Sequence, residues 1–339
     1  MQFPHKIDDK HWLAHARDLL RPLQRQSKGT RYTLAHSHAE GRQFPFQSAL
    51  HALVYRWFDG DMAADELRSA TAQQVEAGEH AGRIPDFQYW PAAEQPSLLA
   101  APPLLAFAGV AVYHMTGDSN MIERLYPRVS AAHDWFDRRA VNGLVIPSHW
   151  TETLRGVHGL NVTTTEYAAV PRDILELNIL RAADLDAVAH LASDMGRKAE
   201  VDAWEERAQT VRRALSDASG HDPLNPLLLF AEAVTPQQAA DISARLLADD
   251  TLWVPERDGE VSLLYNWLIY VGLRHYDLRR AANRIAELAL QRVEYSGDYA
   301  LFDAAAGEGI GQPGASLTAL AVDMLFRERQ SIPPGAHCV

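Results

Sequence analysis

The chain has 339 residues, of which 47% are hydrophobic and 22% are charged, and its formal net charge is −12. This composition is typical of a globular protein with a large core, and an acidic chain without a Lys/Arg-rich stripe is not expected to bind nucleic acid. The single cysteine, Cys338, excludes both a disulfide framework and a metal site built from cysteines.

Most of the chain has the pattern of amphipathic helices, because apolar residues recur at every third or fourth position. Asp118 and Thr235-Pro236 are typical helix starts, and Gly196 and Gly297 are typical helix ends. Helices are predicted over residues 8–27, 48–58, 61–78, 101–116, 119–139, 172–195, 198–217, 223–233, 235–248, 262–276, 278–294 and 313–328.

The connections between these helices indicate an all-α fold. The longest irregular stretches are residues 29–43 and 145–170, and loops of that length are usually functional. No alternating run predicts a sheet of any size, and no repeat of about 34–45 residues predicts a solenoid. We therefore expect one domain over residues 1–330, an (α/α)6 toroid of helical hairpins, followed by a tail at 331–339.

Several long stretches carry family-specific spacing. Residues 171–215 open with Asp173 followed by Asn178-Ile179-Leu180, an Asp-x-x-x-x-Asn-Ile-Leu element. This element resembles the central helical pair of trehalase-like glycosidases, the family 63 glycoside hydrolases and their mannosylglycerate and glucosylglycerate hydrolase relatives. FPFQSALHAL and GRIPDFQYW resemble the early motifs of that family, and YNWLIYVGLRHYDL and FDAAAGEGIGQPGASLTAL resemble its late ones. The resemblance covers nearly the whole chain and implies the six-hairpin glycosidase fold.

The same resemblance implies that both catalytic carboxylates are replaced. The family's general base is the Glu of Gly-Phe-Tyr-Glu-Tyr-Phe-Asp-Pro, and here the matching stretch, 297–304, has Ala300 at that position. The family's general acid is the Asp of Trp-Glu-Ser/Thr-Gly-x-Asp, and the matching position after Trp150 is Arg155 or Gly156. Glycoside hydrolysis needs two carboxyl groups across the scissile bond, so the pattern predicts that hydrolysis has been lost.

Three hypotheses for the function follow. The first is acid–base chemistry of a lyase, isomerase or cyclase type, because histidine and glutamate can transfer protons and arginine can stabilise a developing anion. Its catalytic candidates are His36, His38, His149, Glu152 and Arg155. The second is hydrolysis with relocated carboxylates, Glu152 as acid and Asp298 as base. The structural alternative to this second hypothesis is that Asp298 caps a turn and Glu152 pairs with Arg155. The third hypothesis is a non-catalytic binding or scaffolding protein.

We expect the ligand to be a sugar-like or other small polar metabolite. A structural role for Glu308 in its Gly-Glu-Gly turn is the stronger interpretation, and the pair His36-x-His38 with Glu40 is too weak a pattern to predict a metal. No cofactor is expected. No uncharged apolar run reaches the about 18 residues of a membrane span, so a cytoplasmic monomer or homodimer is predicted. The candidate binding residues are Gln47, His51, Asp86, Tyr89, Trp90, Trp150, Tyr299, Glu308 and Asn266.

Overall fold

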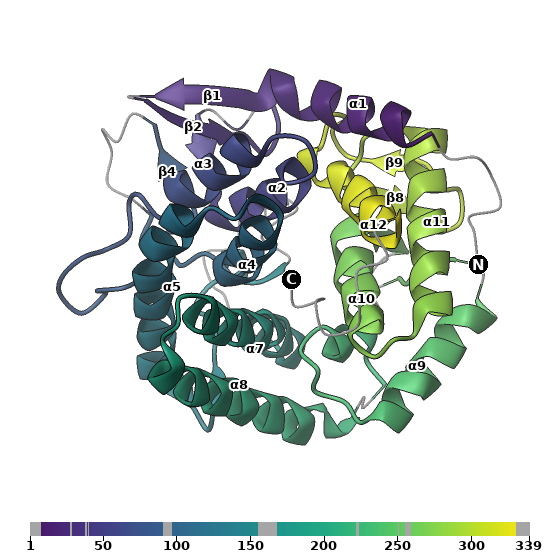
Figure 1. Cartoon of the computed structure of the whole chain (residues 1–339). Coiled ribbons are helices and arrows are strands. Elements are labelled where there is room, and N and C mark those ends of the chain that lie inside the picture. Colours follow the sequence, from purple (N-terminus) through teal and green to yellow (C-terminus); the bar gives the residue numbers. More distant parts are fainter. Residues whose placement is uncertain are drawn as a thin grey trace. The chain divides into compact units, whose positions relative to one another are not determined.

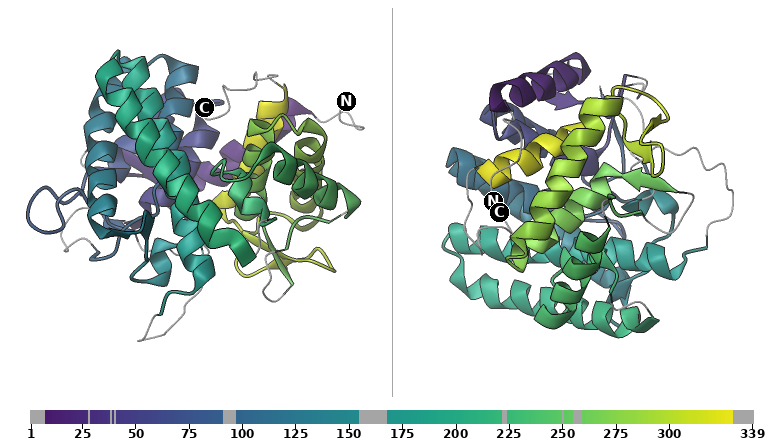
Figure 2. Two further views of the ribbon diagram at one scale, coloured as in Figure 1. Left: turned by 90° about the horizontal axis from the view of Figure 1, so that it is seen from below. Right: turned by 90° about the vertical axis from the view of Figure 1, so that its right-hand side faces the viewer.

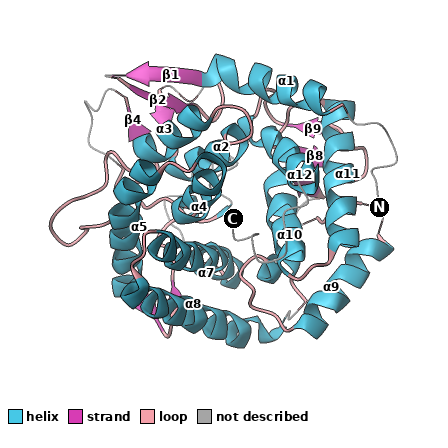
Figure 3. Ribbon diagram, viewed as in Figure 1, coloured by secondary structure: helices cyan, strands magenta, loops and turns pink. Residues whose placement is uncertain are grey.

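The computed structural model is mostly helical, with a few short strands (Figure 3). It contains two compact units: unit 1 comprises residues 1–24, 35–38 and 222–337, and unit 2 comprises residues 25–34, 39–221 and 338–339. None of the described helices is long and apolar enough to cross a membrane. The structure describes residues 8–27, 29–37, 39, 41–90, 97–154, 168–221, 224–249, 251–254 and 259–329.

Unit 2 is built from three helical hairpins (Figure 1). Helix α4 packs against both α2 and α7, while α3, α5 and α8 pair with these three, and Figure 2 shows α7 and α8 side by side. Every residue of α2 is buried, whereas α5 and α8 bury only one face, as expected for inner and outer members of a hairpin. The hairpins are α2 (Pro45–Tyr55) with α3 (Gly60–Ala70), α4 (Leu105–Thr116) with α5 (Ser119–Arg139), and α7 (Pro171–Asp194) with α8 (Lys198–Ala218).

Short β-ribbons and 3-10 turns accompany these hairpins. The ribbons are β1 (Gln24–Ser27) with β2 (Thr30–Thr33), β3 (Arg42–Gln43) with β4 (Gln88–Tyr89), and β5 (Ala140–Val141) with β6 (Leu144–Val145). In the second ribbon Arg42 lies opposite Tyr89, which ties the chain before α2 to the segment after α3. The 3-10 turns of this unit are η2 (Trp150–Glu152) and η3 (Ser219–His221).

Unit 1 surrounds the apolar helix α10, whose residues are buried from Leu263 to Arg274. The indole of Trp267 donates to Asp323 Oδ2 at 2.8 Å and so joins α10 to α12. The helices of this unit are α1 (Asp9–Leu20), α9 (Pro236–Ala248), α10 (Leu263–His275), α11 (Arg279–Ser296) and α12 (Leu320–Arg329). Its other elements are the turns η1 (Arg21–Leu23), η4 (Pro226–Leu229) and η5 (Ser316–Ala319), and a sheet of β7 (Glu260–Ser262), β8 (Leu301–Asp303) and β9 (Gly309–Ile310).

The helix starts and ends predicted from the sequence are confirmed. Asp118 Oδ1 accepts a hydrogen bond from Met121 N at 3.1 Å, and Thr235 caps α9, whose first residue is proline. Gly196 and Gly297 follow α7 and α11 with φ of +72° and +87°, a backbone region that favours glycine.

Four predicted helices were wrong in extent or type. The helix expected over 313–328 begins only at Leu320, after the 3-10 turn η5. The helix expected over 8–27 ends at Leu20, and residues 24–27 form a strand, because Pro22 has no N–H with which to continue the helix. The helix expected over 61–78 ends at Ala70, after which the Thr71 hydroxyl donates back to the carbonyl of Leu67. Within the predicted helix 223–233, the described residues form only the 3-10 turn η4.

Candidate active site

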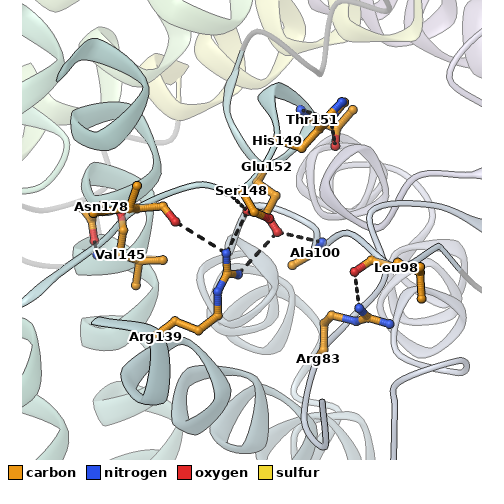
Figure 4. Close-up of polar contacts among 11 residues, drawn as sticks. Arg83, Leu98, Ala100, Arg139, Val145, Ser148, His149, Thr151, Glu152 and Asn178 are labelled. Atoms are coloured by element: carbon orange, nitrogen blue, oxygen red, sulfur yellow. Dashed lines mark hydrogen bonds and ion pairs between the residues drawn. The ribbon is translucent and has the colours of Figure 1, made fainter. Parts of the chain in front are cut away.

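Two chain segments of unit 2 form the base of the candidate site. Residues 83–86 and 98–101 run antiparallel, with a bridge between Pro85 and Ala100 and a hydrogen bond from Asp86 N to Leu99 O at 3.0 Å. The guanidinium of Arg83 donates to the Leu98 carbonyl (Figure 4). The pairing fixes the backbone around Asp86, a residue that belongs to the GRIPDFQYW motif.

Glu152 attaches the neighbouring loop, residues 148–152, to this base. Its carboxylate accepts from Ser148 N at 2.7 Å and Ser148 Oγ at 3.0 Å, and from Ala100 N at 3.2 Å. It also forms an ion pair with Arg139 of α5 at 3.2 Å, and its side chain is only 2% exposed (Figure 4). Both carboxylate oxygens therefore have partners, and Arg139 is a cation partner that the sequence did not indicate.

Asp86 is the second carboxyl at this site, and its surroundings differ from those of Glu152. It is 7% exposed. Burial raises the pKa of its carboxyl, and nearby Glu152 adds to the rise, while hydrogen bonds from Ser97 and Thr151 oppose it. Its Oδ1 has no hydrogen-bond partner among the described residues. Asp86 is thus a buried carboxyl with a raised pKa and with one oxygen that has no hydrogen-bond partner among the described residues.

Two further polar atoms near Asp86 are buried without a partner in the described part of the chain: Arg83 Nε and Trp150 Nε1. Arg83 lies in the base segment 83–86, two residues before Pro85. Trp150 is the neighbour of Thr151, which contacts Asp86. Buried polar groups are normally hydrogen-bonded, so orphaned atoms in one region point to a missing polar partner. A small polar ligand would supply it.

His149 begins the 3-10 turn η2. Its Nδ1 accepts from Thr151 N at 3.3 Å, which leaves the proton of the neutral ring on Nε2. The ring packs on Trp150 with centroids 5.2 Å apart. The structure therefore places His149, Trp150, Glu152 and Asp86 in one region of unit 2.

The other binding candidates of unit 2 contribute mainly to packing. Trp90 donates from Nε1 to Gln43 Oε1 at 2.7 Å and stacks on Tyr32. Tyr89 lies in β4, with its ring edge-on to Phe87 at 5.4 Å. Gln47 and His51 lie on α2 and are 8% and 1% exposed.

Unit 1 holds residues 297–304, where the sequence analysis expects the position of the family's general base. Asp298 accepts from His15 Nε2 at 2.9 Å and from Thr318 Oγ1 at 3.0 Å. The hydrogen bond with Asp298 raises the pKa of His15, against the opposing effect of burial. Further along, Asp303 Oδ1 accepts from Ala305 N and Ala306 N. Both aspartates of this segment are therefore engaged in local bonds.

Three more candidates of unit 1 have structural surroundings. Tyr299 packs its ring on Gly309, where an added Cβ would lie 2.1 Å from the ring. Asn266 donates from Nδ2 to the carbonyls of Trp253 and Ser262 and accepts from Trp253 N. Glu308 is exposed, and the carboxylate that ties its turn is that of Asp303.

The remaining candidates come from the two long loops. His36 is half-buried beside Ala35, whose carbonyl accepts from Ser316 N at 3.3 Å within unit 1. His38 and Arg155 lie outside the described residues, as do Glu40 and Gly156.

Comparison with known proteins decides the fold. The chain resembles the GH63 mannosylglycerate hydrolase of Thermus thermophilus solved with glucose, with a TM-score of 0.74, 17% identity, and coverage of 93% of this chain and 100% of that one. The same enzyme solved with Tris and D-glycerate gives a TM-score of 0.73 at 18% identity, with the same coverage. This chain has the (α/α)6 fold of the GH63 glycosidases.

The sequence resemblance to trehalase-like glycosidases is thereby confirmed at the level of the fold. In addition, residues 41–154 match the family described as the mannosylglycerate hydrolase MGH1-like glycoside hydrolase domain. A rhamnosidase from Klebsiella oxytoca, solved with rhamnose, is also similar, with a TM-score of 0.66 and 14% identity over 96% of this chain and 65% of that one. The matched family segment contains Asp86 and ends two residues after Glu152.

The sequence analysis did not identify the residues that pair with Asp298 and Glu152. His15 and Asp298 are 283 positions apart, and no motif links them. Arg139 is one of two consecutive arginines at the end of α5, and basic residues are common at the C-terminal end of any helix. Asp86 was identified as a binding residue, and the signal for a proton-transfer role was its burial, which only the structure provides.

Proposed function

We propose that this chain is an enzyme on a glycosidase scaffold that acts on a sugar-like or other small polar metabolite by acid–base chemistry, with Asp86 as the proton donor. The observation that carries the proposal is the buried Asp86 carboxyl, whose pKa is raised and whose Oδ1 has no partner among the described residues. A buried carboxyl with a raised pKa keeps its proton to a higher pH than an ordinary aspartate, as a general acid requires.

Other residues of the region have supporting roles in this proposal. Trp150 offers an aromatic face for an apolar sugar face and a buried Nε1–H for a ligand oxygen. The Nε2–H of His149 provides a second group for proton transfer. Glu152 positions the loop, because its bonds to Ser148, Ala100 and Arg139 leave it poorly placed to donate a proton.

We further propose that glycoside hydrolysis has been lost. Ala300 stands where the family has its general base, and the aspartates on either side, Asp298 and Asp303, are bonded to His15 and Thr318 and to two backbone amides. A water-activating carboxylate is therefore lacking from the described part of this segment. Addition–elimination, isomerisation and cyclisation need proton transfer, but they do not need a carboxylate that activates a water molecule.

The experiment is incubation of the protein with a small-molecule extract, followed by mass spectrometry to identify the compound consumed. The Asp86→Asn variant is expected to turn that compound over at least about 100-fold more slowly, the usual contribution of a general acid. The matched control is Asp202→Asn, at an exposed position of α8, which should retain the wild-type rate. Full activity of Asp86→Asn would contradict the assignment of the acid.

The pH profile provides a second measurement. The protonated form of Asp86 is the active one, so the rate should fall as pH rises through its raised pKa. The residual rate of Asp86→Asn should not fall over this pH range. If the rate of the variant falls with pH as that of the wild type does, the titrating group is a residue other than Asp86.

The alternative function is hydrolysis with relocated carboxylates, and the match of residues 41–154 to a glycoside hydrolase domain favours it. Incubation with trehalose, mannosylglycerate, glucosylglycerate and kojibiose distinguishes the two. Our proposal expects no free sugar. Sugar release that Glu152→Gln abolishes would establish the alternative, and binding of these compounds without turnover of any metabolite would indicate a ligand-binding protein.

A further inference from the structure

A groove of about 840 Å³ lies on unit 2, away from the candidate active site. Its walls are α3 and the first half of α5, two helices that contact each other (Figure 1). Leu67, Met121 and Leu125 form an apolar floor and are 1%, 7% and 3% exposed. The volume is in the range of small-molecule sites, which are about 300–1,000 Å³.

The charges around the groove are unbalanced. Three arginines line it, Arg68, Arg124 and Arg128, against a single carboxylate, Asp118. Asp118 is already engaged at the start of α5, where it accepts from Met121 N. The residues that line the groove thus carry more positive than negative charge, on a chain whose net charge is −12.

The existing ion pairs leave these arginines available. Arg68 shares the carboxylate of Asp65 with Arg31, so one negative charge serves two guanidinium groups. The pair of Arg128 with Glu76 is at the surface, with Glu76 77% exposed, and pairs of that kind contribute little.

Arg124 is exposed and has no ion pair within the described part of the chain. Among the described residues, no carboxylate therefore competes with a ligand for this guanidinium. Thr30, Thr71 and Asn120 add hydrogen-bonding side chains to the lining.

We propose that this groove binds a small organic anion with an apolar body and a phosphate or carboxylate group. Guanidinium groups form paired hydrogen bonds with both kinds of anion, and the floor of Leu67, Met121 and Leu125 would cover the apolar part. The site shares no residue with the region of Asp86, so it can be present whether or not the proposed function is correct.

The test is calorimetric titration of the whole chain at low ionic strength with phenyl phosphate, phenylacetate and inorganic phosphate. Saturable binding of at least one aromatic anion is expected, about tenfold tighter than that of inorganic phosphate, because only the aromatic anions bury a ring. The two aromatic probes show which anion is preferred. Absence of saturation with both, at concentrations up to about 10 mM, would overturn the proposal.

The site is located with two variants. Arg124→Ala should weaken binding about tenfold, the effect of losing a charge-assisted hydrogen bond. The control is Arg213→Ala, an exposed arginine whose contacts are with its own helix, and it should bind as the wild type does. Both positions are exposed, so thermal unfolding should be unchanged in each. Equal affinity of the two variants would place the anion elsewhere and overturn the assignment.

Discussion

At the scale of single residues, two carboxyl groups of one region differ because of what surrounds them. Glu152 is buried with a cation and three hydrogen-bond donors, whereas Asp86 is buried beside a negative charge with one oxygen unpartnered among the described residues. Pairing favours the ionised form, and burial alone favours the neutral form. The residue type therefore did not determine the role, and the neighbours did.

Glu66 of α3 is a third buried carboxyl, in the interior of unit 2. Its side chain is fully buried, 4.0 Å from His51 Nδ1. Burial raises the pKa of Glu66 to about 8, and hydrogen bonding with Thr33 and Ser48 opposes the rise only in part. Burial also lowers the pKa of His51 to about 3. Both groups are consequently expected to be neutral at pH values between these two, such as about pH 6.

This arrangement predicts a pH-dependent gain in stability for Glu66→Gln. The pKa of Glu66 is higher in the folded state than its usual 4.5, so the unfolded state loses the proton first as pH rises. The native carboxyl therefore costs stability progressively from pH 4.5 to about 8, and glutamine does not. Relative to the wild type, the variant should gain melting temperature at pH 8 compared with pH 5, by about 2 °C for each kcal/mol in a chain of this size.

Circular dichroism at the two pH values measures this difference. The control is Glu205→Gln, at an exposed position of α8, which should show no change with pH. If Glu66→Gln instead loses stability at pH 8, Glu66 and His51 form an ionised pair and the prediction is wrong.

At the scale of elements, the inner helices depend on close backbone contact as well as on apolar side chains. Gly272 of α10 faces η4, where an added Cβ would lie 2.5 Å from Leu229 C and 2.6 Å from Phe230 N. Both are backbone atoms, which cannot move independently of their turn. The glycine thus allows α10 and η4 to pack directly against each other in unit 1.

Gly272→Ala is therefore expected to destabilise the protein. Overpacking of this kind costs about 1–3 kcal/mol, and the better helix propensity of alanine returns at most about 1 kcal/mol. Gly220→Ala is the matched control, since no atom lies within 4 Å of its added Cβ. Urea unfolding of the two variants measures the difference, and equal stability would mean that η4 moves without cost.

At the scale of the whole molecule, the chain has the (α/α)6 fold of the GH63 glycosidases at only 17–18% sequence identity. Few large apolar side chains are exposed in the described part of the chain: Leu98, Met115, Val141, Ile146 and Tyr295. Such scattered residues do not form the broad apolar patch of an obligate interface. Of the monomer and the homodimer, we predict the monomer.

Small-angle X-ray scattering tests the monomer. A compact chain of this length has a radius of gyration of about 20 Å, and a compact dimer about 26 Å. The lower value is expected at every protein concentration. A radius of gyration near about 26 Å that persists on dilution would contradict the prediction.

The sequence by itself determined the fold class, the helix caps and the glycine ends, because periodicity and capping are local properties of the chain. The resemblance also led to the prediction, which is still to be tested, that Ala300 takes the position of the family's general base. Only the tertiary structure decided which carboxyl is paired and which is not. The partners of Glu152 and Asp298 come from other helices, Arg139 from α5 and His15 from α1. Burial and pairing across the fold set the charge of a side chain, and neither is encoded by its sequence neighbours.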